Sequence, residues 1–440
     1  MTGLRFLLAF AVLPLLGLAT WIFPGVRALA LPARIGVAGA AGAVLLSVEM
    51  FLLHLMGVQW SAPVIAAPLL IASTVGVWVA VRRRRAPSGR QPDRRTSPFL
   101  ALTVFALLLA TYAAGTARAT SVDLLLFWGG KAARFAAEGQ IDAAFLSDPR
   151  NRFMHPDYPP LFTSLGAWAT LAAGRFAWGA ALLTMPLFLA ATALTFFGFA
   201  RETVGRERAS QLTALLAALL SFACVVSLSA GNAEPPLLLF ETLALAGIVF
   251  GRGKTRDAAV AVGLAGAVWT KVEGAAFAAL CVFLFLWFQR ADPARWKRLL
   301  RVAAPAAVLL VSWILWAAHH GLLQAYLGAT YGGFSAERWK LVLVRLLQTA
   351  DYGAFYLPWL LLLFLSPLRW RNPDARALVG MAVVYLLFIF FSYLHGSFDQ
   401  TAWIQWSAER LLMTPLLFLF FASAASARKA EPSESGRLLP

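Results

Sequence analysis

Apolar runs that recur along the whole chain constrain its fold more than any other feature. A helix of roughly 20 such residues matches the thickness of a bilayer core. The alternation of apolar and polar residues that a transmembrane strand requires is missing from the sequence. We therefore expect an all-α polytopic membrane protein with about 13 transmembrane helices. The candidate spans are residues 4–23, 34–56, 63–81, 98–117, 176–200, 209–228, 234–250, 256–270, 273–289, 300–318, 352–368, 376–394 and 409–427.

The composition supports the same class of protein. Hydrophobic residues make up 60% of the chain, charged residues 13%, and the mean hydropathy is +0.71, which is far from a soluble globular composition. The two cysteines, Cys224 and Cys281, lie inside apolar segments. Small packing residues of this kind indicate neither a disulfide framework nor thiol chemistry.

The net charge of +17 indicates membrane topology rather than nucleic-acid binding. The basic residues gather in short segments between spans, where positive charge is retained on the cytoplasmic side. These clusters are found at 82–95, 201–208, 252–256, 290–301, 369–376 and 428–429. We expect all of these clusters on the cytoplasmic side of the cell membrane. Segments 118–160 and 395–408 and the N-terminus are then expected on the outer side, and the C-terminus on the cytoplasmic side.

Three regions are expected along the chain. Residues 1–97 form an N-terminal three-span segment and a basic cytoplasmic linker. Residues 98–427 form a transmembrane catalytic module with an external, juxtamembrane helical loop at 118–174. Residues 428–440 form a disordered cytoplasmic tail. Within the loop, 161–174 is apolar but short for a span, so we expect a helix along or dipping into the outer membrane face.

The external loop carries the first candidate acid. Asp123, Phe127 and Lys131 are spaced so that they share one face of an α-helix. A carboxylate there, flanked by leucines and a tryptophan, is expected to be partly desolvated, which raises its pKa and suits it to act as a general base. The alternative is a surface salt bridge between Asp123 and Lys131, and the spacing does not decide between the two.

His155, Asp157 and Tyr158 follow in a proline-rich stretch, His-Pro-Asp-Tyr-Pro-Pro. His155 and Asp157 are suited to bind an acceptor, a phosphate or a metal, and a purely structural turn explains them equally well. Two possible ligands do not define a metal site, so we expect no bound metal and no cofactor.

Further charges lie at the outer ends of predicted spans. Glu234 ends a turn before Pro235 and is either a partner of the helix dipole or a second site acid. Lys271 and Glu273 lie in a turn between two spans, where Lys271 either binds a lipid phosphate or extends to the interface. Arg410 either binds phosphate oxygens or is neutralised by the adjacent Glu409.

Together these residues resemble polytopic glycosyltransferases of the GT-C superfamily, in the broad group with protein O-mannosyltransferases and aminoarabinose transferases. The resemblance covers residues 98–427. It rests on five pieces, listed in chain order: Asp123 with Phe-Trp-x-x-Lys-Ala, His-Pro-Asp-Tyr-Pro-Pro, Gly-Asn-Ala-Glu-Pro, Trp-Thr-Lys-Val-Glu-Gly and Ser-x-Glu-Arg-Leu-Leu. Many relatives carry an aspartate where this sequence has Glu234.

The resemblance implies a specific reaction. A sugar passes from a polyprenyl-phosphate carrier to an acceptor hydroxyl at the outer membrane face, with inversion at the anomeric carbon. Asp123 is then the base, and Lys271 and Arg410 stabilise the carrier phosphate. The partners would be the lipid-linked donor, membrane lipids, and a glycan, lipid or protein acceptor. The competing hypothesis is a transporter or flippase, which predicts polar residues near the middle of the bilayer.

Overall fold

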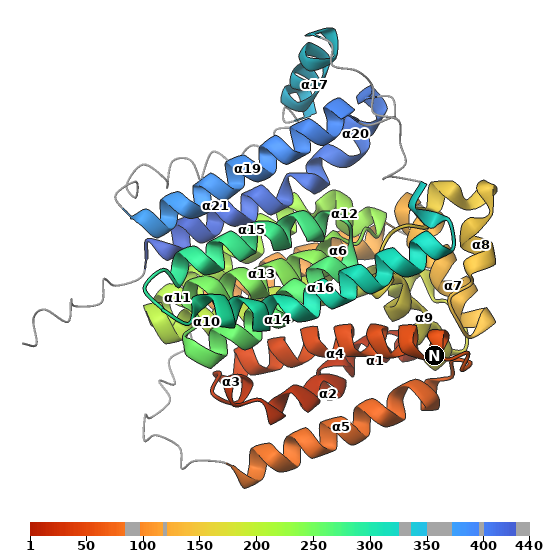
Figure 1. Cartoon of the computed structure of the whole chain (residues 1–440), viewed down its shortest axis with the longest axis horizontal. Coiled ribbons are helices and arrows are strands. Elements are labelled where there is room, and N and C mark those ends of the chain that lie inside the picture. The colour runs from red at the N-terminus through yellow and green to blue at the C-terminus, as the bar shows by residue number, and fades with distance from the viewer. Residues whose placement is uncertain (84–96, 118–120, 325–335, 350–371, 396–399, 428–440) are drawn as a thin grey trace, which may run out of the picture.

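The computed structural model describes residues 1–83, 97–117, 121–324, 336–349, 372–395 and 400–427 (Figure 1). Every regular element within these ranges is a helix, which confirms the expected all-α class. The expected span at 352–368 and the tail at 428–440 lie outside the described residues, as does most of the basic linker.

The elements fall into an N-terminal group, a loop group and a main bundle. The N-terminal group and α6 are α1 (Thr2–Ala11), α2 (Leu13–Leu16), η1 (Gly17–Ile22), α3 (Pro24–Arg27), α4 (Leu31–Leu55), α5 (Ala62–Arg82) and α6 (Pro98–Thr116). The loop group is η3 (Leu124–Trp128), α7 (Gly129–Glu138), α8 (Ala143–Ser147), η4 (Pro149–Met154) and α9 (Leu161–Ala173).

The main bundle contains most of the long helices. It comprises α10 (Trp178–Val204), α11 (Arg206–Ala223), α12 (Val225–Ala230), α13 (Glu234–Phe250), α14 (Gly253–Thr270), α15 (Glu273–Phe288), α16 (Arg295–His319), η5 (Leu322–Gln324), α17 (Ala336–Thr349), α19 (Pro373–His395), α20 (Gln400–Leu411) and α21 (Met413–Ala425). Because α13 is apolar on all sides, it can be enclosed by its neighbours. Every residue of α13 is buried, and α10, α14, α15 and α21 pack around it.

Eight stretches in the described part of the chain are long and apolar enough to cross a membrane. They are Thr2–Ile22, Leu31–Leu55, Ala62–Arg82, Pro98–Thr116, Trp178–Val204, Arg295–His319, Pro373–Leu394 and Ser407–Ala425. A multi-pass helical membrane protein follows from this set. Four of the other expected spans correspond to the shorter or less apolar helices that begin at Arg206, Glu234, Gly253 and Glu273, and the fifth, 352–368, lies outside the described residues, so the count of about 13 remains a prediction.

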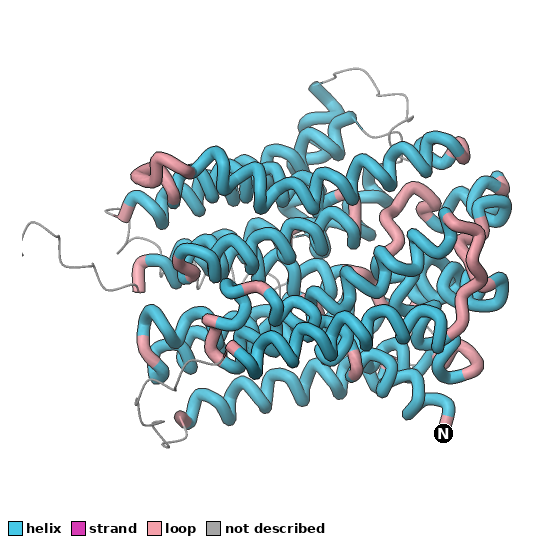
Figure 2. Tube along the Cα trace, turned by 60° about the horizontal axis from the view of Figure 1, so that its bottom comes forward, coloured by secondary structure: helices cyan, strands magenta, loops and turns pink. Residues whose placement is uncertain are grey.

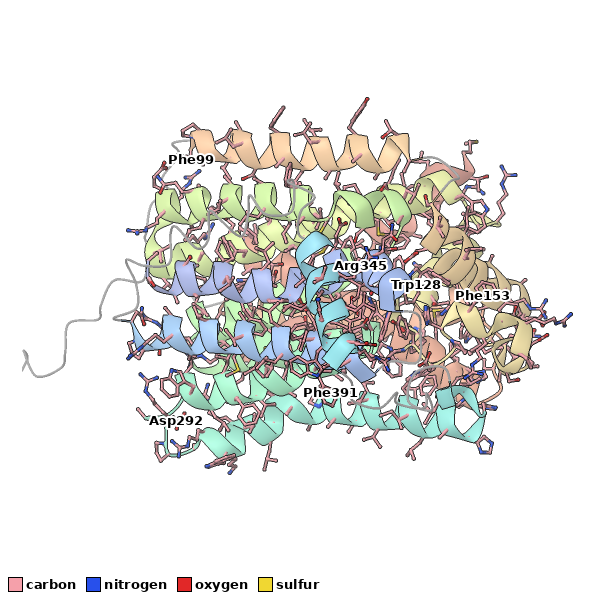
Figure 3. The ribbon with its side chains drawn as sticks, turned by 90° about the horizontal axis from the view of Figure 1, so that it is seen from above. Phe99, Trp128, Phe153, Asp292, Arg345 and Phe391 are labelled. Carbon is pink, nitrogen blue, oxygen red and sulfur yellow. The ribbon has the colours of Figure 1, made fainter. Side chains whose placement is uncertain are left out.

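The long helices run roughly side by side, and the loops lie mainly at their two ends (Figure 2). Trp128 and Phe153 of the loop group lie at one end, and Asp292 lies at the other (Figure 3). We call the first the loop end and the second the basic end, because basic residues of α10, of the turn between α15 and α16, and of the start of α16 lie there. Ion pairs join the helices at this end, for example Arg298 of α16 with Asp257 of α14 at 2.6 Å.

Helix α9 corresponds to the segment that was expected along the outer membrane face, and it is buried within the protein. Helix α9 forms close to the predicted range, but residues 161–170 are all buried, and α1, α4 and α7 pack around it. Trp168 donates a hydrogen bond from its indole to the Ala9 carbonyl at 3.0 Å. Helix α9 is therefore covered by other helices of the protein rather than by lipid on one side, because a helix that is apolar on all sides can be enclosed by its neighbours. Its position along or into the outer membrane face stays a prediction.

Candidate functional site

Five charged residues from segments far apart in the sequence meet at the loop end. Asp123 precedes η3, Glu234 begins α13, Lys271 and Glu273 flank the turn between α14 and α15, and Arg410 lies near the end of α20. Three ion pairs lie among them: one joins Arg410 to Asp123, and two join Lys271 to Glu234 and Glu273. The charges of Glu234 and Glu273 also act on Arg410, which places the two sets close together. We call these five residues the charged cluster. The sequence predicted each member, and the structure brings them into one place.

Arg410 and Asp123 form the first pair. Arg410 Nη1 lies 2.5 Å from Asp123 Oδ2. The two side chains are 20% and 15% exposed, so the pair is largely shielded from water but reachable from it. Among the described residues, the ion pair of Arg410 is with Asp123, 287 positions earlier, and not with the adjacent Glu409. Local neutralisation by Glu409 is therefore not the role of this carboxylate in the structure.

Lys271 lies between two carboxylates. Its Nζ is 2.7 Å from Glu234 Oε1 and 3.3 Å from Glu273 Oε1. Lys271 is 6% exposed and Glu234 4%. A lysine that extends to the interface would keep its ammonium group in water, so that reading does not describe Lys271. Burying such charges is tolerated because each has an opposite charge in contact.

The start of α13 places Glu234 in the charged cluster. Glu234 is the first residue of α13, although the following proline predicted that it would lie before the helix. Pro235 and Pro236 occupy the first turn, where the missing N–H costs nothing. Glu234 therefore meets both expectations, as a carboxylate at a helix N-terminus and as a member of the site.

The charged cluster holds three carboxylates and two cations, which gives a formal charge of −1 at neutral pH. Several of its buried atoms have no hydrogen-bond partner among the described residues: Glu234 Oε2, Glu273 Oε2 and Arg410 Nε. Polar atoms of this kind are costly to bury without a partner. They mark where a bound polar group would be received.

Asp123 is affected by opposing influences. Burial raises the pKa of its carboxyl above the ordinary value, while the neighbouring Arg410 guanidinium lowers that pKa and leaves a net upward shift. A raised pKa is what a general base needs in order to hold a proton after accepting it. To act as a base, Asp123 must also be accessible to the group that gives up the proton.

Asp123 and Lys131 do not form the pair that their spacing suggested. A π-helical turn, η3, lies between them and interrupts the α-helical periodicity. Lys131 Nζ instead donates a hydrogen bond to the His155 carbonyl at 3.1 Å and lies 4.7 Å from the Trp128 ring centre. Burial lowers the pKa of Lys131 to about 7.

His155 lies in the predicted turn with a left-handed backbone, φ +51°, which is rare for a residue with a side chain. Its ring stacks on Tyr158 with centres 4.9 Å apart. Burial lowers the pKa of His155 to about 3, so the imidazole is neutral at physiological pH. This packing favours a structural role for His155 over a metal-binding one.

Asp157 and Tyr158 connect the turn to its surroundings. Burial raises the pKa of Asp157 to about 6, and among the described residues its Oδ1 has no hydrogen-bond partner. The Tyr158 hydroxyl is 3.4 Å from Glu273 Oε1, and its ring centre is 5.8 Å from Lys271 Nζ. Tyr158 therefore forms one edge of the charged cluster.

Sequence reasoning missed two residues that support the site. Trp313 of α16 donates from its indole to the Asp157 carbonyl at 2.8 Å. Thr414 donates to both oxygens of Glu241 at 2.9 and 3.1 Å, two helical turns below Glu234 in α13. No local pattern marks either one, because each partner lies more than 150 positions away.

The arrangement offers a base, an adjacent cation and hydrogen-bond acceptors at the end of a helix bundle. Within the described residues, no group of three or more His, Cys, Asp or Glu side chains is placed to hold a metal ion. Comparisons with known proteins give no match to a family model, to a curated protein or to a solved structure.

Proposed function

We propose that this protein is a membrane glycosyltransferase that moves a sugar from a polyprenyl-phosphate-linked donor to an acceptor hydroxyl. The observation that carries the proposal is the contact between Asp123 and Arg410 at the loop end. A lipid-linked donor must keep its chain in the bilayer while its phosphate and sugar reach water. A base and a cation at the ends of apolar helices suit such a substrate.

The proposed reaction is a single displacement. The acceptor oxygen bonds to the anomeric carbon as its proton passes to Asp123. The bond between that carbon and the carrier phosphate oxygen breaks on the opposite side, so the configuration inverts. The bonding electrons leave with the phosphate, and Arg410 stabilises the resulting charge through charge-assisted hydrogen bonds.

The pairing within the charged cluster separates the roles of the two cations. Lys271 is in contact with two carboxylates and is nearly inaccessible. Arg410 is more exposed, contacts one carboxylate and retains a buried Nε without a partner among the described residues. We therefore assign the donor phosphate to Arg410 and the positioning of Glu234 and Glu273 to Lys271. The sequence had assigned the phosphate to both.

A donor phosphate would compete with Asp123 for the guanidinium. In the substrate-free protein Asp123 is paired with Arg410 through Oδ2, so that oxygen is engaged. When the phosphate takes over the planar donors of Arg410, Asp123 is released to accept a proton. The donor would thus activate the base, and an acceptor arriving alone would find Asp123 occupied.

Asp123→Asn tests the proposal. The substitution removes the base and also the charge that competes for Arg410. We expect transfer to fall by a factor of about 10²–10⁴, while donor affinity rises by about tenfold or more, because a charge-assisted contact is worth roughly 1.5–3 kcal/mol. Both are measured on purified protein with a radiolabelled polyprenyl-phosphate sugar.

Glu409→Gln is the matched control, since it removes a neighbouring carboxylate that is not paired with Arg410. It should leave both quantities within about twofold, a change of less than 0.5 kcal/mol. Near-normal transfer by Asp123→Asn would refute the role of Asp123 as base. Loss of transfer with weakened donor binding would refute the competition for Arg410.

Transport is the second candidate, and Glu241 is the observation that favours it. This carboxyl is fully buried inside α13 and is held by Thr414. A translocation path requires several polar groups at such depth. The ion pairs among the described residues lie instead at the loop end and the basic end, which supports a transferase.

A further inference from the structure

A groove opens at the basic end, far from the charged cluster. Its cavity volume is about 350 Å³, and it lies between the end of α15, the start of α16 and the start of α19. Asp292, in the turn between α15 and α16, marks this end in Figure 3. Nothing in the proposed reaction uses the groove.

The walls of the groove are apolar and face outward. Phe283 of α15 is 62% exposed, and Met381 of α19 lines the opposite side. Helices α16 and α19 are both candidate membrane spans, and α15 is a shorter apolar helix, so we expect these walls to face lipid chains. Exposed apolar surface at that depth is suited to contact with an acyl chain.

The composition of the groove changes toward its outer rim. Trp287 and Trp296 are 42% and 59% exposed and line it near the turn. Tryptophan is enriched at the level of lipid headgroups, because its ring is apolar and its N–H is polar. The groove therefore passes from hydrocarbon-like walls to an interfacial layer within a few residues.

Two arginines complete the rim. Arg290 Nη1 donates to the Trp287 carbonyl at 2.9 Å and lies 3.2 Å from Asp374. Arg295 Nη1 donates to the Arg290 carbonyl at 2.7 Å. Among the described residues these bonds use one nitrogen of each guanidinium, so both groups are anchored while further donors remain for an anion.

The N-terminus of α16 adds to the positive potential of the two rim arginines. Arg295 begins α16, and no acidic residue lies in the first turn of that helix. Asp292, just before the helix, accepts a hydrogen bond from the Ala294 N–H, and its charge is balanced by an ion pair with Arg298 at 2.7 Å. The partial positive charge of a helix N-terminus favours an anion there. Asp374 in the first turn of α19 offsets part of this potential through its ion pair with Arg290.

We propose that this groove binds an anionic phospholipid of the membrane. Its phosphate would contact Arg290 and Arg295, its glycerol region would lie beside Trp287 and Trp296, and one acyl chain would lie against Phe283. A soluble anion would gain nothing from the apolar walls, and an uncharged lipid would gain nothing from the arginines. The order of groups along the groove matches the order of groups along a phospholipid.

Native mass spectrometry of the full chain in detergent tests this, with phosphatidylglycerol and phosphatidylcholine as probes. The wild type should retain phosphatidylglycerol in preference. The Arg290→Gln, Arg295→Gln double variant should lose about tenfold or more of that preference, since each basic side chain near a lipid surface contributes about 1 kcal/mol. The matched control is the double variant Arg206→Gln, Arg208→Gln at the same end but outside the groove.

Equal loss in both double variants, or equal binding of the two lipids by the wild type, would overturn the proposal. Inorganic phosphate is the second probe: if millimolar phosphate displaces phosphatidylglycerol completely, the groove is only an anion site. Should the glutamine variant fail to fold, Arg290→Lys, Arg295→Lys should keep the preference, and adding Phe283→Gln to it should reduce retention. Unchanged retention in that last variant would refute the role of the apolar wall.

Discussion

Arg410 and Lys271 have the same formal charge and different surroundings, so their removal should have different consequences. Arg410→Met takes away the proposed phosphate ligand, and donor affinity should fall by about ten- to a hundredfold. Lys271→Met leaves Glu234 and Glu273 buried without a cation, which costs roughly 3–5 kcal/mol of stability. Measurements of donor affinity should therefore detect the effect of Arg410→Met, and measurements of the melting temperature should detect the effect of Lys271→Met.

The charge-preserving variants separate charge from shape. Lys271→Arg should keep most of the stability, because a cation still lies between the carboxylates. Arg410→Lys should keep part of the donor affinity but lose the planar donor geometry. A Lys271→Met protein with wild-type thermal stability and donor affinity reduced as much as in Arg410→Met would reverse the two roles.

Asp157 provides a prediction about pH. Its folded pKa is about 6, above the value of about 3.9 expected in an unfolded chain. The folded protein therefore holds this proton between about pH 4 and pH 6, and its contribution to stability is lost as the pH rises through 6. It amounts to about 3 kcal/mol at most. Asp157→Asn cannot titrate, so its melting temperature should gain on that of the wild type between pH 5 and pH 7.

The melting temperatures of both proteins are measured in the same detergent across that range. Asp148→Asn is the control, because Asp148 is paired with Arg150 at the surface, and the hydrogen bonds from Arg150 lower the pKa of Asp148. Its melting temperature should follow that of the wild type at every pH. A constant difference between Asp157→Asn and the wild type would contradict the buried, protonated state of Asp157.

The members of the charged cluster could be predicted from residue type and from their positions near span ends. The contacts between them could not be predicted from the sequence. The partner of Asp123 lies 287 positions away, and no periodicity connects residues at that distance. The pairing that local spacing left open as one of two alternatives, Asp123 with Lys131, does not form, because η3 changes the helical phase between them. Local periodicity holds only where the helix stays regular.

At the scale of elements, the turn before α13 controls where Asp123 lies. Gly231 ends α12 with φ +71°, and a Cβ added there would be 2.7 Å from the Leu124 side chain. Leu124 follows Asp123 and begins η3. Gly231→Ala should therefore displace η3 as well as strain its own backbone by about 1–2 kcal/mol. Transfer activity should fall more than the loss of stability explains.

Gly174→Ala is the control for that experiment. Gly174 has φ +82°, so it carries the same kind of backbone cost, but open space surrounds its Cβ position. Comparable loss of stability in the two variants, with loss of transfer only in Gly231→Ala, is the expected result. Equal transfer rates would show that the contact with Leu124 does not position Asp123.

Helix positions were predictable from apolar length, and their packing was not. The short apolar segment expected at 161–174 matches α9, Leu161–Ala173. The location of α9 depends on α1 and α4, more than 100 positions earlier. The same tertiary packing begins α13 at Glu234, against the local preference of a residue before proline.

At the scale of the whole molecule, the loop group lies at one end of the bundle, and the connections from α10 to α11 and from α15 to α16 lie at the other (Figure 1). Basic residues lie in or next to both of these connections. The sequence predicted this separation from charge alone, because basic residues are retained on one side of a membrane. The structure contains no membrane, so which end faces outward remains a prediction.

Cysteine labelling in intact cells decides the orientation. We expect a membrane-impermeant maleimide to label Arg150→Cys, whose native side chain is 88% exposed at the loop end, without permeabilisation. Lys254→Cys, exposed at the basic end, should react only after permeabilisation. The native Cys224 and Cys281 are fully buried and should give a low background. Labelling in the opposite order would place the charged cluster on the cytoplasmic side, where a donor carried on the outer leaflet could not reach Arg410.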